Sequence, residues 1–440
     1  MKPLKIRISP NLVASVLLFV AAIFAAVVAN SPLANYYEGF LSRELYLRVG
    51  EFNLFSHGGH PLTMLEFIND CLMTIFFLSV GLEIKRELLV GELSSFRKAI
   101  LPIIAACGGM LLPVLVFSFL VPSGSAAMKG CAIPMATDIA FSLGVLSLLG
   151  KRVPLSLKIF LTAFAVVDDI GGILVIAIFY SDHVAVGYLL VSALLYALLY
   201  YFGRRGVTAK IVYLGVGVII WYLFLQSGIH STISGVILAF MFPARPNIDA
   251  GKYIEKIRNI LNSFPVTDSH EIVLTNEQIH QLKRVEQASD FVISPLQSME
   301  NNLHSLVNFI ILPLFAFANA GVVFSGGGEV VGDVSIAVAV GLLLGKFVGI
   351  FIFTWVTIKL GIAIMPQGMN WKNVAGVSLL GGIGFTVSLF IANLSFAAAH
   401  PDLLNQAKFG VLSGTIIAGI LGYVVLHAVL PKPAPSAPVK

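Results

Sequence analysis

The stretch FLTAFAVVDDIGGILVIAIFY, residues 160–180, places two adjacent carboxylates, Asp168 and Asp169, inside a run that is otherwise apolar enough for the interior of a lipid bilayer. An ionisable side chain at the centre of a spanning helix costs about 2.5–3.5 kcal/mol on insertion scales, so such residues normally face a partner or an aqueous cavity. Neighbouring residues on a helix point about 100° apart. We therefore predict that this stretch is a membrane helix and that the two acids have different surroundings and different roles.

The composition of the whole chain is also typical of a membrane protein. Of its 440 residues, 57% are hydrophobic and only 12% are charged, whereas about 25% are charged in an average soluble domain. A spanning helix needs roughly 20 mostly apolar residues, because its backbone must be hydrogen-bonded within the segment itself. The segments that fit are 11–30, 62–84, 99–121, 128–149, 155–179, 185–202, 209–225, 228–243, 303–324, 334–358, 373–398 and 408–430. We predict an all-α, polytopic membrane protein of about twelve transmembrane helices in a single domain, residues 1–440.

The distribution of positive charge predicts the orientation of these helices. Most of the 28 Lys and Arg residues fall in loops on the same side as the N-terminus. The exceptions are Arg43, Arg48, Lys129, Lys408 and the intramembrane Lys346. The positive-inside rule then places both termini in the cytoplasm and accounts for the net charge of +5 without a nucleic-acid partner. The three cysteines have no CxxC or metal-ligand spacing, so we expect small packing residues and no cofactor.

Two polar segments lie outside the predicted helices. The longer one, residues 243–302, is too short to fold alone and could supply a helix or two. Within it, Thr275 followed by Gln278 has the spacing of a capping box at a helix start. This loop could bind a regulator or lie on the membrane face. The Pro-rich end of the chain, residues 431–440, reads as a disordered tail.

The intramembrane ionisable residues are the candidates for chemistry. Asp138, Asp168, Asp169 and Lys346 all fall within predicted spans. Two carboxylates in a partly dehydrated site resist simultaneous ionisation, so such a pair can hold protons or a cation. A small hard cation such as sodium or lithium binds oxygen ligands and must displace protons from them. An ion pair between Asp168 and Lys346 that only locks helices together remains the structural alternative. Asp70, for which a packing role is equally open, is left outside this group.

Two predicted spans contain residues that interrupt a helix. GCAIPMATDIAFSLG, residues 130–144, contains Pro134 and the polar pair Thr137 and Asp138. Proline removes a backbone hydrogen bond and clashes with the preceding turn. We therefore expect the fourth helix to be discontinuous. Opposed half-helix ends would place dipole ends in the interior, where Asp138 could offset the positive ends and Lys346 the negative ends.

The eleventh span has a comparable interruption. GVSLLGGIGFTVSLF, residues 376–390, offers Gly381, Gly382 and Gly384 at a similar depth. Small residues also permit close helix packing, so neither segment is decisive alone. Each is, however, the middle one of three helices, which predicts inverted repeats with an ion site at the midplane. The expected core repeats are residues 99–179 and 334–430, and residues 11–84 and 185–324 are expected to form the interface helices.

Six motifs in the chain resemble the NhaA family of sodium/proton antiporters, and the resemblance covers nearly the whole sequence. They are FFLSVGLEIKREL (76–88), ATDIAFSLGVL (136–146), FLTAFAVVDDIGG (160–172), SGIHSTISGVI (227–237), LPLFAFANAG (312–321) and GGIGFTVSLFIA (381–392). The resemblance implies an electrogenic exchanger that moves more than one proton inward for each Na+ or Li+ expelled. It also implies a bacterial inner-membrane location and a homodimer that uses the polar hairpin between the first two helices.

The resemblance further implies roles for particular residues. The ion- and proton-binding residues would be Asp168 and Asp169, which hold Na+, assisted by Thr137 and Asp138, with Lys346 as the partner of Asp168. The pH-response candidates are Glu83, Lys85, Arg86, Glu87, His230, Glu300 and His304. Asn301 occupies a position that can be histidine in the family, which weakens the carry-over to Glu300 and His304. The alternative for the first four is solvated charge at a helix end, and for His230 a hydrogen-bonded structural histidine.

These observations predict alternating access, in which Na+ and H+ compete for the same buried carboxylates. Acidity inside should then suppress exchange even without a dedicated sensor. A sodium-coupled symporter for an organic solute is the rival transport function. An intramembrane aspartyl protease is the rival of another class, since two membrane aspartates can do acid and base work. The YD and GxGD motifs in which such proteases resemble one another do not occur around Asp138 or Asp168.

Overall fold

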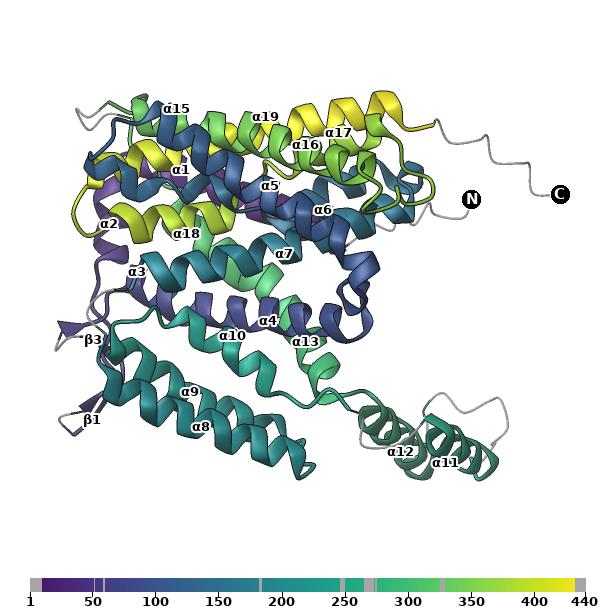
Figure 1. Cartoon of the computed structure of the whole chain (residues 1–440). Helices are drawn as coiled ribbons and strands as arrows, with labels where there is room; N and C mark the ends of the chain where they lie inside the picture. The colour runs from purple at the N-terminus through teal and green to yellow at the C-terminus, as the bar shows by residue number, and fades with distance from the viewer. Residues whose placement is uncertain are drawn as a thin grey trace.

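Long apolar helices make up most of the chain (Figure 1). The computed structural model describes residues 10–50, 52–57, 60–181, 184–245, 250–264, 273, 275–324 and 329–431. Within this part, 9 helical segments are long and apolar enough to cross a membrane. Five of them are single helices, namely α1 (Pro10–Ala29), α5 (Phe96–Leu120), α7 (Leu155–Phe179), α8 (Val186–Arg204) and α9 (Lys210–Ser227). A sixth, α19 (Pro401–Val429), ends the described chain.

The other three long segments each contain a π-helical turn. They are α3 (Met64–Phe67), η1 (Ile68–Leu72) and α4 (Met73–Val90); α13 (Pro295–Leu306), η6 (Val307–Ile311) and α14 (Leu312–Asn319); and α15 (Asp333–Val340), η7 (Gly341–Gly345) and α16 (Lys346–Lys359). A π-helical turn inserts an extra residue and is frequent at functional sites. Here η1 contains Asp70, and η7 ends immediately before Lys346. Each insertion rotates the rest of its helix relative to the bilayer and to its neighbours.

Two further segments are bent. Ala126–Met135 is followed by Ile139–Leu148 at 44°, and Trp371–Leu380 is followed by Phe385–Phe396 at 43°. The helical pieces are η3 (Ala126–Gly130), η4 (Ile133–Met135) and α6 (Ile139–Leu148) in the first, and α17 (Trp371–Leu380) and α18 (Phe385–Phe396) in the second. Among the described residues the candidate spans number 9, or up to 11 if each bent pair crosses as one.

The prediction of twelve spans is therefore not confirmed. The predicted segment 228–243 corresponds to α10 (Thr232–Met241), which has only 10 residues. A left-handed Gly228, with φ of 79°, ends α9 before it, and the extended Phe242 ends α10. Ten residues span about 15 Å, which is half the thickness of the hydrocarbon core.

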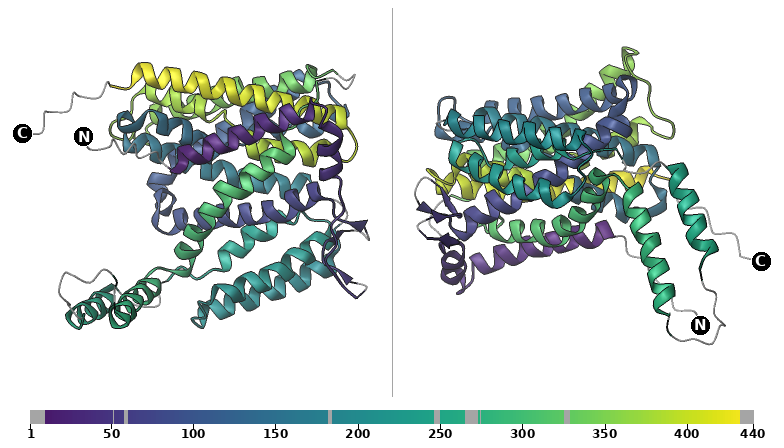
Figure 2. Two further views of the ribbon diagram at one scale, coloured as in Figure 1. Left: turned by 180° about the vertical axis from the view of Figure 1, so that it is seen from behind. Right: turned by 90° about the horizontal axis from the view of Figure 1, so that it is seen from below.

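The remaining elements lie at the two ends of the bundle (Figure 1). At one end are α2 (Ala34–Leu41) and two short antiparallel hairpins, β1 (Arg48–Val49) with β2 (Phe52–Asn53) and β3 (Ser56–His57) with β4 (His60–Pro61). At the opposite end, where α19 ends, are η2 (Glu92–Ser94), η5 (Gly150–Arg152) and the paired helices α11 (Ala250–Asn262) and α12 (Asn276–Val292). The hairpin of α11 and α12 projects from the bundle in Figure 2.

The predicted loop 243–302 is thus partly helical. It contains α11 and α12, and its last residues already belong to α13, which begins at Pro295. The capping box is present, because the Thr275 hydroxyl accepts from Gln278 N at 3.3 Å and Gln278 Oε1 accepts from Thr275 N at 2.9 Å. Of the predicted tail, residues 432–440 lie outside the described part of the chain.

The helices form two groups. One group contains α5, α6, α7 and α15 to α19, and the other places α8 and α9 on the far side of α4, α10 and α13 (Figure 1). Seen from behind, α1 lies against α14, and these two helices are also in contact in the structure (Figure 2). The same order of elements occurs twice in the first group. A long helix, a bent pair and a second long helix follow one another from α5 to α7 and again from α15 to α19. The two repeats, residues 99–179 and 334–430, stay a prediction.

Glycines bring α5 and α16 into backbone contact at the centre of the first group. A Cβ added at Gly349 would meet the backbone of Gly108 and Gly109 N, the latter at 3.2 Å. Helices in a membrane associate through such close packing of small residues, because lipid provides no hydrophobic drive between them. The contact fixes α16, and hence Lys346, against α5.

We expect Gly349→Leu to disrupt this packing. The added side chain meets backbone atoms that cannot move aside, so the free energy of unfolding should fall by about 3 kcal/mol or more. Thermal unfolding of the detergent-purified protein measures the effect. The matched control is Gly215→Leu on α9, where a Cβ meets nothing within 4 Å. Equal unfolding temperatures for the two variants would show that the α5–α16 contact is not needed.

Candidate functional site

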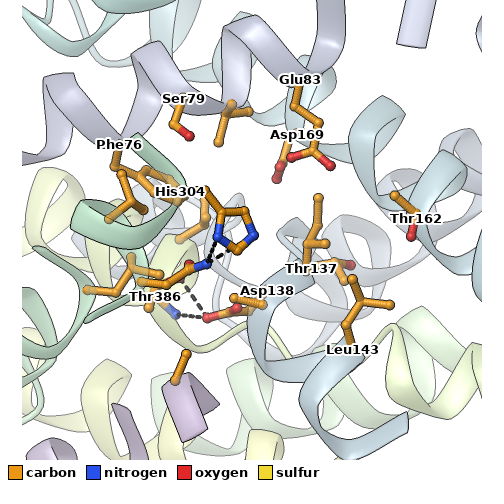
Figure 3. A pocket seen from close by; sticks show the side chains of 18 of the residues that line it. Phe76, Ser79, Glu83, Thr137, Asp138, Leu143, Thr162, Asp169, His304 and Thr386 are labelled. Carbon is orange, nitrogen blue, oxygen red and sulfur yellow. Dashed lines mark hydrogen bonds between the residues drawn. The ribbon is translucent and has the colours of Figure 1, made fainter. Parts of the chain in front are cut away.

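A cavity of about 330 Å³ lies between the two groups of helices and connects surface charges to the buried acids. Figure 3 shows most of its side chains. They come from α1, α4, the segment before α6, α6, α7, α13, η6, α14 and α18. Its polar lining residues are Ser79, Glu83, Arg86, Thr137, Asp138, Thr162, Asp169, Glu300, His304, Asn308 and Thr386. Apolar side chains such as Phe76 and Leu143 complete the wall. The cavity therefore offers a polar path through an apolar bundle.

The outer part of the cavity carries an ion-pair cluster where α4 and α13 meet. Arg86 lies 2.7 Å from a carboxylate oxygen of Glu300 and 3.0 Å from one of Glu87. His304 also lines this part, and one of its ring nitrogens is 3.0 Å from the Asn308 amide nitrogen. The structure thus brings four of the seven predicted pH-response residues, Glu83, Arg86, Glu300 and His304, to one cavity wall. Glu87 contacts the cluster through Arg86.

Asp169 forms the inner end of this path. Its side chain lines the cavity, although the residue as a whole is only 7% exposed. Figure 3 shows its carboxylate beside that of Glu83, and the two groups interact electrostatically. Within the described part of the chain, no side chain or backbone group donates a hydrogen bond to the Asp169 carboxylate. An acid in this position is available to a proton or a cation that enters through the cavity.

Asp168 points in another direction and forms a buried ion pair. Its carboxylate contacts the Lys346 ammonium, and both side chains are inaccessible to solvent. Lys346 Nζ also donates to Thr137 Oγ1 at 2.8 Å, and that hydroxyl donates to the carbonyl of Gly381 at 2.9 Å. The chain of contacts therefore runs from α16 through the first helix break to the second. The different surroundings predicted for the two adjacent acids are present.

The two bent segments meet at their breaks, and Asp138 joins them. One oxygen of its carboxylate accepts from Phe141 N at 2.9 Å and so caps α6. The other accepts from Thr386 N at 3.2 Å and Thr386 Oγ1 at 2.7 Å, at the start of α18. Its own N–H donates to the carbonyl of Ile383 at 2.6 Å. One carboxylate thus faces two helix N-termini, where negative charge is favourable.

The predicted helix-breaking residues lie at this crossing. Pro134 lies in η4, immediately before the first break, and a Cβ added at Gly341 would meet its ring. Gly381, Gly382 and Gly384 form the second break, where added side chains would meet neighbouring segments. At Gly384, for example, a Cβ would lie 3.0 Å from the carbonyl oxygen of Ala136. Glycine therefore allows the two backbones to approach each other here.

Removing the double cap should weaken the crossing. We expect Asp138→Ala to lower the free energy of unfolding by about 1–3 kcal/mol, because it leaves buried donors of α6 and α18 unpaired. Sodium-dependent proton release should persist, since both Asp138 oxygens are already occupied by donors. Thermal unfolding and a proton-release assay measure the two effects. Asp333→Ala removes an exposed acid from the first turn of α15 and is the control. A stability loss no larger than that of the control would contradict the capping role.

Two of the predicted pH-response residues belong neither to the cavity wall nor to its ion-pair cluster. Lys85 donates to the carbonyls of Phe240 and Phe242 at 2.6 Å each, at the C-terminal end of α10. It is therefore a helix-capping cation, as expected for positive charge near a helix C-terminus. His230 lies with its Nδ1 3.7 Å from a carboxylate oxygen of Asp70, away from this cavity. Ser231 Oγ donates to the same carboxylate at 3.3 Å, so Asp70 belongs to a separate polar contact.

Two residues that sequence reasoning missed complete the crossing. Thr386 donates to Asp138, and Ser142 Oγ donates to the carbonyl of Leu380 at 3.0 Å. Both are hydroxyl residues a few positions after a helix break, which is the pattern typical of capping. Their partners lie more than 200 residues away in the sequence, so the pattern alone could not identify them.

The oxygen atoms at the inner end suit a hard cation only in part. Oδ1 of Asp168 is buried and has no hydrogen-bond partner within the described part of the chain. No group of three or more His, Cys, Asp or Glu side chains among the described residues is arranged to hold a metal ion. A small cation can also take hydroxyl, carbonyl and water oxygens. Asp168, Asp169 and Thr137 offer such atoms, as transient ligands of a transported ion would.

Comparison with known proteins identifies the family. Residues 7–426 match the sequence model of the family described as Na+/H+ antiporter 1. The chain belongs to this family. A relative from Bacteroides thetaiotaomicron, named Na(+)/H(+) antiporter NhaA, is 72% identical over 423 residues, which is 96% of each chain. A protein of the same name from Phocaeicola vulgatus is 59% identical and covers 94% of this chain and 93% of its own.

Family membership sets the class of activity. Proteins named as NhaA antiporters are transporters and not enzymes, so the protease alternative has no support. Among solved structures, the sodium proton antiporter MjNhaP1 from Methanocaldococcus jannaschii has a TM-score of 0.45 and 14% sequence identity. The match covers 93% of this chain and 90% of the MjNhaP1 chain. A likeness at this level supports no conclusion about the site.

Proposed function

We propose that the protein expels Na+ or Li+ in exchange for more than one H+ and that both ions compete for Asp168 and Asp169. One observation carries this proposal. A cavity leads from the charged ends of α4 and α13 to Asp169, while Asp168 is paired with Lys346 directly behind it. Membership in a Na+/H+ antiporter family names the two ions. A symporter for an organic solute would need a further binding pocket beside these acids.

Competition follows from the position of Asp169. Its carboxylate is a buried acid on the cavity wall and lacks a fixed donor within the described residues. Burial in an apolar bundle disfavours an isolated negative charge, so the group is stabilised either by a proton or by a cation. Sodium entering from the cytoplasm must therefore displace the proton, and a high proton concentration prevents sodium from binding.

Sodium that reaches Asp168 must also displace Lys346. The ammonium occupies a carboxylate oxygen of Asp168, whose other oxygen is buried without a partner. In the sodium-free state Asp169 holds one proton and the Lys346–Asp168 pair shares a second. If both leave when one sodium ion binds, each cycle moves net positive charge inward. The membrane potential then contributes about 2.3 kcal/mol per charge per 100 mV.

The ion pairs near the cavity mouth offer a basis for pH activation. Arg86 on α4 forms an ion pair with Glu300 on α13, and both helices form the cavity wall. Protonation of the Glu300 carboxylate would weaken this pair, change the contact between the two helices and so alter the access of ions to Asp169. By the positive-inside rule this mouth faces the cytoplasm, with both chain termini on the same side of a bacterial inner membrane. The hairpins at the opposite end would serve a homodimer.

Everted vesicles with a pH-sensitive dye test the proposal. In vesicles prepared from cells that produce the protein, added NaCl or LiCl should release protons from the vesicle interior, and KCl should not. The rate should rise with pH and should increase when an interior-negative potential, built up by exchange, is dissipated by a permeant cation. Proton and sodium fluxes in the same direction would instead establish symport, and a rate unaffected by voltage would contradict the proposed stoichiometry.

A further inference from the structure

A second cavity, of about 580 Å³, lies at the end of the bundle where α5 begins and α16 ends. Its wall comes from three places, the start of α5 with the preceding η2, the first turns of α7, and the segment after α16. It shares no lining residue with the cavity that leads to Asp169. Neither sodium binding nor proton exchange, as proposed above, uses it. The cavity therefore needs a separate explanation.

One side of this cavity is positively charged. Arg97 and Lys98 lie in the first turn of α5, where the N-cap Ser95 makes no side-chain capping bond. Glu92 also lines the cavity, but its carboxylate lies 4.0 Å from the Lys98 ammonium and this lysine side chain remains 60% exposed. Among the described residues, no acidic side chain lies within ion-pair distance of Arg97. Two cations beside a helix N-terminus favour a negatively charged ligand.

The other side of the cavity is apolar and continues onto the exposed surface of the protein. Leu101, Ile159, Phe160 and Ala163 line it, together with Ile364, which is 89% exposed. A small soluble anion would gain nothing from these side chains. An amphipathic anion would place its charge at Arg97 and Lys98 and its chain along the wall. Basic pockets between membrane helices on the cytoplasmic side bind anionic lipid head groups in this way.

We infer that this cavity binds one anionic phospholipid of the cytoplasmic leaflet, with the head-group phosphate at Arg97 and Lys98. The assignment to that leaflet rests on the proposed topology. An acyl chain would pass between α5 and α7 and leave the cavity beside Ile364. Because α7 also carries Asp168, about 7.5 Å of helix rise beyond Ala163, a bound lipid would stabilise the helix that presents the ion-binding acids. The occupant is recognised by its phosphate and its hydrocarbon chain together.

Native mass spectrometry of the purified full-length protein tests this site. The protein is titrated with phosphatidylglycerol or phosphatidylcholine in mixed micelles, and the fraction that retains one lipid is measured. Phosphatidylglycerol should bind preferentially. The Arg97→Ala/Lys98→Ala double variant should bind it at least on the order of tenfold more weakly, since each cation near an anionic lipid contributes about 1 kcal/mol. Ile159→Ser, which truncates the apolar wall, should weaken binding while both cations remain.

The matched control is Lys283→Ala/Arg284→Ala, which removes an adjacent Lys–Arg pair from the exposed surface of α12. This variant should bind phosphatidylglycerol like the unaltered protein. Equal binding of phosphatidylcholine, unchanged binding by the Arg97 and Lys98 variant, or an equal loss in the control would overturn the inference. So would competition by millimolar inorganic phosphate alone, which would indicate a soluble anion. The assay involves no ion exchange, so its failure would leave the proposed antiport untouched.

Discussion

Replacement of Asp169 by Asn is expected to abolish sodium-dependent proton movement. The substitution preserves the size of the side chain but removes the carboxylate on the cavity wall that we propose to hold either a proton or sodium. Because the Asp169 carboxylate receives no hydrogen bond from the described residues, its loss should leave the fold intact. Purified variants in proteoliposomes with an internal pH-sensitive dye should show exchange at the level of empty liposomes.

The same result is expected for Asp168→Asn, although for a different reason. This change removes the partner of Lys346 and leaves an ammonium group buried among α5, α7 and α16. The matched control is Asp402→Asn, which neutralises an exposed acid in the first turn of α19. Full exchange in the control is required to attribute the loss to the position of the acids. Retained exchange in both buried variants would exclude Asp168 and Asp169 as the ion site.

Lys346→Ala is expected to cause the largest loss of stability. The substitution leaves the Asp168 carboxylate fully buried without its partner, and breaking a buried pair in this way costs about 3–5 kcal/mol. Removing both charges, in Asp168→Asn/Lys346→Gln, should recover much of that loss, because neither group is then an uncompensated ion. The thermal unfolding midpoint of each detergent-purified protein measures the difference.

The double variant separates a structural role from a transport role. If the pair only locks helices, the stable double variant should still exchange sodium for protons. We expect instead that it is stable but inactive, because the Asp168 oxygens and one exchangeable proton are both lost. Lys359→Ala, at the exposed end of the same helix, should match the unaltered protein in both measurements. A double variant less stable than Lys346→Ala would contradict the assignment of the pair.

Much of the helical architecture was predictable because the length of each apolar run can be read directly from the local sequence. The predicted span 155–179 coincides with α7 (Leu155–Phe179), and both helix breaks lie at the predicted proline and glycines. The predicted count of twelve spans is not confirmed at α10, where residues 228–243 are apolar enough but a left-handed Gly228 and the extended Phe242 shorten the helix. The hydropathy of a segment does not predict where its backbone turns end a helix.

The sequence predicts the candidate residues more readily than the packing that brings them together. The angle between Asp168 and Asp169 required different surroundings, and the family resemblance implied Lys346 as the partner of Asp168, but the sequence does not show that α16 packs against α5 to make this contact. The π-helical turn before Lys346 rotates its side chain around the helix axis, and the hydrophobic periodicity of the sequence does not predict this rotation. Asp138 shows the same limit, because its second helix cap comes from Thr386. Lys85 faces α10 because the C-terminal end of that helix lies beside α4. This neighbourhood of two helices cannot be predicted from the sequence.

Isothermal titration of the purified protein with NaCl, in buffers of different ionisation enthalpy at one pH, tests the central claim most directly. The heat should vary with the buffer because sodium binding releases protons, by more than one per sodium where the site is fully protonated. Asp169→Asn should remove the buffer dependence. Sodium binding with the same heat in every buffer would mean that the two ions do not share the carboxylates, and it would contradict the exchange mechanism.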